Sequence, residues 1–138
     1  MNFITIHFVG ILVAVLAGFA TGALWFSPKT FFPLWWRTME KPADEVPGKG
    51  SGMGEIFTSL IVSLIVQAVV LSGVINGFYP HASVLQGAWV GALIAVAFSA
   101  MPSLGHRLFA GHGFLVWALE AGNDIAALAI MGAIIAAM

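Results

Sequence analysis

The strongest candidates for chemistry in this sequence are the polar residues of its last apolar segment. Glu120, Asn123 and Asp124 are spaced i, i+3 and i+4, so on a helix they share one face. Counted from Phe114, where the segment begins, Glu120 would lie roughly 9 Å deep in a bilayer and Asp124 roughly 15 Å deep. A charged acid near the bilayer centre costs about 2.5–3.5 kcal/mol, so an acid retained there is a candidate functional residue.

The apolar segments contain no Lys or Arg that could neutralise these acids. Three outcomes remain: the acids are protonated, they bind a cation, or they face a water-filled cavity. A structural reading stands beside the functional one. Asn123 and a protonated Asp124 could join helices by hydrogen bonds, and Glu120 could face water near the helix end. The sequence leaves both readings open.

A second polar stripe lies in the segment 56–78, where polar residues recur every four positions at Ser59, Ser63 and Gln67. Counted from the start of that segment, Ser63 would lie roughly 10 Å deep and Gln67 roughly 16 Å deep, level with the two acids. Ser59 is more typical of a serine that bonds its own helix backbone. Thr21 in the first segment lies near the depth of Glu120. The sequence therefore predicts one buried polar cluster, made up of Thr21, Ser63, Gln67, Glu120, Asn123 and Asp124.

The composition places these residues in a membrane. The chain of 138 residues is 60% hydrophobic and only 8% charged, whereas soluble domains carry about 25% charged residues. Four long apolar segments cover residues 3–26, 56–78, 84–101 and 114–138. Each can span a bilayer as a helix, and none alternates as a barrel strand does. We predict an all-α integral membrane protein, a single membrane domain over residues 1–138 folded as a four-transmembrane-helix bundle, with Pro102 ending the third helix.

The loops predict how the bundle is oriented. Within the loop 27–55, Lys29–Met39 is rich in aromatic residues and is expected to be an interfacial segment between helices 1 and 2, while Glu40–Gly54 resembles a flexible linker. All five Lys and Arg residues fall in this loop or in the loop 102–113. The positive-inside rule therefore places both loops in the cytoplasm and both termini on the outer side. The first segment lacks a basic start and a cleavage site, so we expect it to stay as a helix.

Two ridges of small residues predict close helix packing. They step by four residues along the first and third segments, at Gly10, Ala14, Gly18 and Gly22 and at Gly87, Gly91, Ala95 and Ser99. The spacing leaves open whether the ridges pack within one bundle or between subunits.

Several function classes are excluded or disfavoured. The absence of cysteine excludes disulfides, thiolate metal sites and c-type haem, and a net charge of −1 provides no footprint for nucleic acid. No hydrolase, zinc-protease or phosphate-loop motif occurs, so we do not expect an enzyme, a bound metal or a cofactor. The histidines could ligate a b-type haem in pairs, but they stand at segment edges, which favours interfacial hydrogen bonding: His7, His81, His106 and His112.

Two stretches resemble a known family. Leu12–Pro28 (LVAVLAGFATGALWFSP), with its Trp-Phe-Ser-Pro exit, resembles the opening helix of a family of small bacterial membrane proteins catalogued as domain of unknown function 1761. Leu119–Ala136 (LEAGNDIAALAIMGAIIA) resembles that family's closing helix. The resemblance implies a four-helix, multi-pass protein of the bacterial inner (plasma) membrane, and it brings no established activity.

Two functional hypotheses follow. In the first, the protein is a small inner-membrane homo-oligomer whose polar cluster moves protons, a cation or a small polar solute across the lipid bilayer. Asp124 would be the carrier, Glu120 would couple it to the cytoplasm, and Asn123 and Gln67 would orient the carboxyl groups. In the alternative, the chain is a non-catalytic accessory or structural subunit of a larger membrane complex, and its small-residue ridges and aromatic loop contact partners.

Overall fold

The computed structural model describes residues 7–138, and within them the chain forms helices and no strand. Its elements are α1 (Phe8–Trp25), α2 (Phe32–Thr38), α3 (Met53–Phe78), α4 (Val84–Ala95), η1 (Val96–Ala100), α5 (Met101–Phe109) and α6 (Gly113–Ala137). The elements α4, η1 and α5 run on as one long helix, so four helices are long and apolar enough to cross a membrane. The predicted four-helix fold is confirmed, and the chain is a multi-pass membrane protein. The predicted residues 3–6 of the first segment lie outside the described residues.

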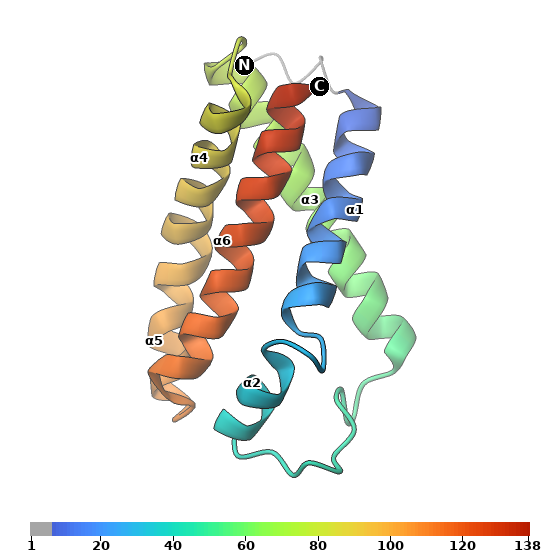
Figure 1. The fold of residues 1–138 in the computed structure, drawn as a ribbon, viewed down its shortest axis with the longest axis vertical. Helices are drawn as coiled ribbons and strands as arrows, with labels where there is room; N and C mark the ends of the chain where they lie inside the picture. Colours follow the sequence, from blue (N-terminus) through green and yellow to red (C-terminus); the bar gives the residue numbers. More distant parts are fainter. Residues whose placement is uncertain (1–6) are drawn as a thin grey trace.

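The last helix, α6, is the centre of the bundle. It lies between α4 and α1 and also packs against α3, α5, η1 and α2 (Figure 1). The start of α1, the end of α6 and the α3–α4 turn lie at one end of the bundle, and α2 and the end of α5 lie at the other (Figure 1). Side chains on α6 can therefore contact residues from every other helix, so a site on α6 can be built from several helices.

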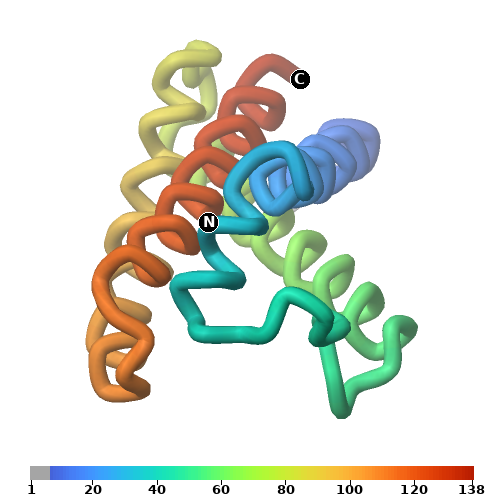
Figure 2. Tube along the Cα trace, turned by 60° about the horizontal axis from the view of Figure 1, so that its bottom comes forward, coloured from blue at the N-terminus to red at the C-terminus, as the bar shows by residue number. Residues whose placement is uncertain are grey.

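The helix α3 packs against the bundle along only half of its length. Its buried residues all belong to its second half, at Ala68, Leu71, Ser72, Gly73 and Ile75. Its first half is largely exposed, and Figures 1 and 2 both show it diverging from α6 toward the α2 end. Because α3 diverges, its polar residues Ser63 and Gln67 face α6 across a gap.

The small-residue ridges lie inside this one bundle. A Cβ atom on Gly91 would lie 1.9 Å from the carbonyl oxygen of Leu128, and one on Gly132 would lie 2.1 Å from that of Gly87, so α4 and α6 touch backbone to backbone. On α1, a Cβ atom on Gly18 would lie 2.8 Å from Met131 Sδ. Ala14 and Ala95 are fully buried, whereas Gly10 and Gly22 meet their neighbours at ordinary distances.

The predicted end of the third helix at Pro102 is wrong. The helix continues to Phe109 and leaves a loop of only Ala110–His112. Proline usually breaks a helix because it lacks an N–H group and its ring clashes with the carbonyl group four residues earlier. Here the π-helix η1 precedes it, and the extra residue of a π-turn gives the ring room. Pro102 also stands in the first turn of α5, where proline is tolerated.

A side chain of α6 supports this junction. The carbonyl oxygen of Ala100 accepts hydrogen bonds from Trp117 Nε1 at 2.6 Å and from Ser103 Oγ at 3.1 Å. We expect Trp117→Phe to lower the free energy of unfolding by about 1 kcal/mol, because the carbonyl loses a donor. Detergent unfolding followed by circular dichroism measures this change. Trp89→Phe, at an exposed indole of α4, is the control, and an equal loss there would contradict the prediction.

The aromatic segment predicted between the first two membrane helices forms a cluster at the end of α1. The ring centroids of Phe26 and Trp35 are 5.1 Å apart, and those of Phe32 and Trp36 are 5.4 Å apart. Trp36 is buried and donates from Nε1 to the carbonyl oxygen of Pro42 at 2.9 Å, which ties the following linker to α2. The cluster therefore fixes α2 against the bundle rather than leaving it as a free loop.

Candidate functional site

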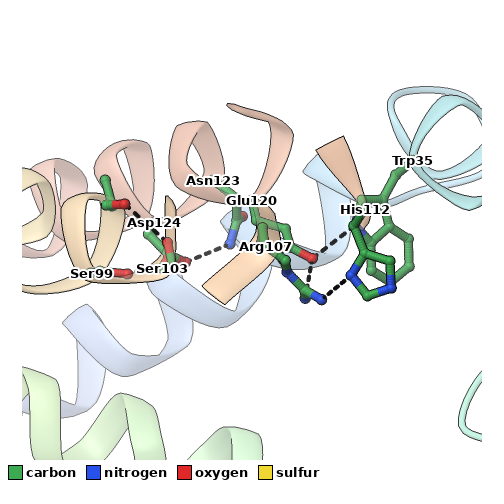
Figure 3. Close-up of polar contacts among 9 residues, drawn as sticks. Trp35, Ser99, Ser103, Arg107, His112, Glu120, Asn123 and Asp124 are labelled. Atoms are coloured by element: carbon green, nitrogen blue, oxygen red, sulfur yellow. Dashed lines mark hydrogen bonds and ion pairs between the residues drawn. The ribbon is translucent and has the colours of Figure 1, made fainter. Parts of the chain in front are cut away.

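Asp124 lies in the middle of the 25-residue helix α6, roughly 16 Å from its start. One carboxylate oxygen accepts a hydrogen bond from Ser99 Oγ on η1, and the other accepts one from Asn123 Nδ2 at 3.4 Å (Figure 3). Both partners are neutral. The contact with Ser99 follows from the glycine packing of α4 on α6, which brings this wall of the bundle close to the carboxyl group.

Glu120 has a different environment, one turn closer to the α2 end. Arg107 donates from Nε to Glu120 Oε2 at 2.7 Å and from a terminal nitrogen to Oε1 at 2.6 Å, so the two side chains form a bidentate ion pair (Figure 3). Trp35 Nε1 donates to the same Oε1 at 3.0 Å, and Arg107 also contacts His112 Nδ1 at 3.0 Å. The expectation that no basic residue of the membrane helices neutralises the acids is therefore wrong for Glu120. The expectation fails because it ends the third helix at Pro102. The helix continues to Phe109 and carries Arg107.

The two acids thus fall into separate classes. Glu120 is charge-balanced and held by three side-chain hydrogen bonds. Asp124 hydrogen-bonds only neutral groups among the described residues, and the Lys and Arg residues other than Arg107 all lie between α1 and α3, at Lys29, Arg37, Lys41 and Lys49. Asp124 is therefore the acid whose charge the described residues leave unbalanced.

The remaining predicted cluster residues are only partly brought together. Gln67 Nε2 donates to Ser63 Oγ at 2.8 Å, so these two form a pair on α3. Thr21 does not join them, because its hydroxyl donates to the carbonyl oxygen of Ala17 one turn back on α1. Ser59 likewise bonds the carbonyl oxygen of Glu55, as its position predicted. The Asn123 amide donates to Asp124, while its Oδ1 is buried without a hydrogen-bond partner among the described residues.

Two cavities flank the carboxyl group of Asp124. The first, of about 480 Å³, lies between α3, the α4–η1 helix and α6, and its polar lining is Ser63, Gln67, Ser99 and Asp124. The second, of about 580 Å³, lies between α1, α2, α3 and α6, and its polar lining is Ser63, Gln67, Asn123 and Asp124. The pair on α3 and Asp124 line both cavities, so they stand at the boundary between them.

The sequence matches one described protein family over residues 9–136, under the description "Protein of unknown function (DUF1761)". The chain belongs to the DUF1761 family. The resemblance found in its first and last helices is thereby confirmed. No match was found among curated proteins or among solved structures. Membership in DUF1761 supplies no activity, so the chemistry of this chain has to be argued from its geometry.

Four residues of the candidate site in this DUF1761 chain do not stand out as site residues in the sequence: Trp35, Ser99, Arg107 and His112. The sequence predicts for Ser99 only a place on a packing ridge, although the same face, turned toward α6, also puts it near the acids. The sequence places Arg107 in a loop because Pro102 predicts a helix end. Residues 103–110 contain no further proline, which allows a longer helix.

The arrangement in this DUF1761 chain can bind and release a positive charge. A carboxylate at mid-membrane depth, with neutral donors on both oxygens, has a free energy that falls when a proton or another cation joins it. Among residues 7–138, no three His, Asp or Glu side chains gather as a metal site would require. The chemistry that a carboxyl group in this setting offers is reversible protonation or the binding of a cation.

Proposed function

We propose that this protein moves a proton, a small cation or a small polar solute across the membrane by way of Asp124. One observation carries the proposal: a carboxyl group at the middle of a membrane helix lines two cavities and has no basic partner among the described residues. A carboxyl group that only joined helices by hydrogen bonds would not need to line two cavities. An acid that exchanges a proton or a cation needs adjoining space that the ion can enter, and each cavity provides such space.

The contacts support the same role for Asp124 as the sequence suggested and a different role for Glu120. Ser99 and Asn123 orient the Asp124 carboxyl group, and the pair Ser63–Gln67 provides neutral polar groups across the cavities. Glu120 is occupied by Arg107 and Trp35, so in this proposal it is a positioning residue that ties α2 and α5 to α6 instead of relaying charge.

The proposal includes an orientation. All five Lys and Arg residues lie at the α2 end of the bundle, in the α1–α3 connection and in the last turn of α5. Basic residues favour the cytoplasmic side, so we propose that this end faces the cytoplasm of a bacterial inner membrane and that both termini face outward. Cysteine labelling at the exposed positions Ser51 and His81 from outside intact cells tests it, with reaction expected only at His81.

Proteoliposomes test the transport role. Vesicles loaded with K⁺ and treated with valinomycin impose a membrane potential, and an internal pH dye reports proton movement. We expect the wild-type protein to raise the proton flux at least tenfold above empty vesicles, and Asp124→Asn to return it to that background because the exchangeable carboxyl group is lost. Parallel assays with Na⁺ or K⁺ as the measured ion cover small cations.

The matched control is Glu45→Gln, which removes a carboxylate from the linker and should keep the wild-type flux. Equal flux in the wild type and in Asp124→Asn would overturn the proposal. Native mass spectrometry of protein extracted from its own membrane then tests the alternative. Foreign subunits at fixed stoichiometry would support an accessory or structural role, and a self-oligomer alone would argue against it.

A further inference from the structure

The cavity between α1, α2, α3 and α6 has two chemically different walls. Its volume of about 580 Å³ is in the range of small-molecule sites, which are mostly apolar with a few placed polar groups. One wall is aromatic and consists of Phe19, Phe26, Phe32, Trp35 and Phe57. The other wall is polar and centres on Asn123 and Asp124. A ligand that fills this space would need an apolar body and one polar end.

The polar wall favours a positively charged end. Among residues 7–138, Asp124 is the only charged residue that lines the cavity, and no Lys or Arg lines it. The neighbouring acid, Glu120, is already balanced by Arg107. An anion would meet an uncompensated carboxylate here, whereas a cation would supply the missing charge.

The same wall has more hydrogen-bond acceptors than donors. The carboxylate of Asp124 receives one bond from Ser99 and one long bond from the Asn123 amide. Asn123 Oδ1 is buried and has no donor among the described residues. Because a carboxylate can accept about four hydrogen bonds, Asp124 can still accept bonds from a ligand that brings N–H groups. An ammonium group carries both the charge and the donors.

The aromatic wall indicates what the ammonium group is attached to. Trp35 packs on Phe26 with ring centroids 5.1 Å apart and is fixed at its other end by Glu120. Phe19 and Phe57 form a second pair across α1 and α3, with centroids 6.2 Å apart. Aromatic faces stabilise organic cations and bury apolar bodies. A bare proton or a metal ion gains little from such a wall.

We infer that the cation handled at Asp124 is an organic ammonium ion with an apolar, ring-sized body. The ammonium group would lie at Asp124 and Asn123, and the body would lie among the rings of Phe19, Trp35 and Phe57. This assignment rests on the proposed function for its transport role, and it names the substrate class of that site. The second cavity shares Asp124 but contributes Phe98 and aliphatic side chains in place of the aromatic wall.

Binding of three matched probes to the wild-type protein tests the inference. The protein is placed in phosphatidylcholine nanodiscs and titrated by calorimetry, with tryptophan fluorescence as a second readout. The probes are 2-phenylethylammonium, the neutral 2-phenylethanol with the same body, and ethylammonium with the same charge and no ring. We expect 2-phenylethylammonium to bind at least tenfold more tightly than either of the others. This comparison uses the wild-type chain and does not depend on how any variant folds.

Variants locate the binding site. Asp124→Asn should weaken binding of 2-phenylethylammonium at least tenfold, and Phe57→Leu should weaken it about threefold or more. Phe98→Leu, which changes only the second cavity, should leave the affinity unchanged. A loss at Phe98→Leu with none at Phe57→Leu would overturn the placement. Equal binding of 2-phenylethanol would overturn the charge assignment and indicate an apolar site that a lipid chain fills.

The outcome separates this inference from the proposed function. Proton flux that depends on Asp124, without binding of 2-phenylethylammonium, would overturn the organic-cation assignment and leave the transport proposal standing. Binding that depends on Asp124, without flux of either the proton or the amine, would support the binding site and overturn transport.

Discussion

Replacing Gly91 with alanine is expected to destabilise the bundle by about 3 kcal/mol, at the upper end of the usual cost of overpacking. The added Cβ atom would lie 1.9 Å from the carbonyl oxygen of Leu128 and 2.6 Å from its carbonyl carbon. These are backbone atoms of α6, so no side-chain rotation relieves the overlap and the two helices must separate. Titration of the micelle-bound protein with denaturing detergent, followed by circular dichroism, measures the change.

The matched control is Gly105→Ala on the same membrane helix. Gly105 is helical, and a Cβ atom there would meet no atom within 4 Å. Alanine favours a helix over glycine by about 1 kcal/mol, so this variant should be as stable as the wild type or slightly more stable. Equal stabilities for the Gly91 and Gly105 variants would contradict the backbone contact between α4 and α6.

Gly91→Ala should also change the candidate site. Ser99 follows Gly91 by two turns on the continuous helix of α4 and η1, and its hydroxyl donates to Asp124. Moving α4 away from α6 would lengthen this hydrogen bond. A folded fraction of the Gly91 variant should therefore show a reduced Asp124-dependent flux in proteoliposomes, whereas Gly105→Ala should not.

The membrane-spanning fold was predictable because it depends on local properties of the chain. Backbone groups in lipid have to be satisfied within a helix, so long uncharged segments such as 3–26 and 56–78 are enough to place spans. The end of the third helix was not predictable in the same way. It depends on a π-turn and on the indole of Trp117, which comes from another helix.

The candidate site was likewise predictable where it depends on a single helix, and not predictable where it depends on contacts between helices. The spacing of Glu120, Asn123 and Asp124 placed them on one side of α6, because helical periodicity is a property of a single segment. Depth alone did not identify their partners: Thr21 lies at a suitable level but bonds its own helix. Ser99 reaches Asp124 because close packing of α4 on α6 sets the rotation of both helices. Such rotations are fixed by contacts between helices, which no single segment specifies.

The second large effect is expected at the ion pair between Arg107 and Glu120. Arg107→Gln should lower the free energy of unfolding by about 2 kcal/mol, because it leaves a partly buried carboxylate without its partner. Breaking a fully buried pair costs about 3–5 kcal/mol, but these side chains are 32% and 20% exposed, so solvent recovers part of that loss. Glu120→Gln should cost about 1 kcal/mol, because Arg107 sits in the last turn of its helix, where cations are favoured.

A double-mutant cycle isolates the pair. The Arg107→Gln and Glu120→Gln double variant should be less destabilised than the sum of the two single variants, with a coupling free energy of about 1–2 kcal/mol. The i,i+4 pair between Lys41 and Glu45 is the control, because it makes a single contact of 3.3 Å within the linker and its lysine is 43% exposed. Its coupling should be about 0.5 kcal/mol or less, as for other surface pairs.

The cycle also decides the role of Glu120 in transport. An acid held by Arg107 and Trp35 is not free to exchange a proton with Asp124, so Glu120→Gln should keep the Asp124-dependent flux within about twofold of the wild type after correction for folded protein. A coupling as weak as that of the linker pair, together with loss of flux in Glu120→Gln, would contradict this assignment. Glu120 would then be the acid that connects Asp124 to the α2 end, and the ion pair with Arg107 would be one of its exchangeable states.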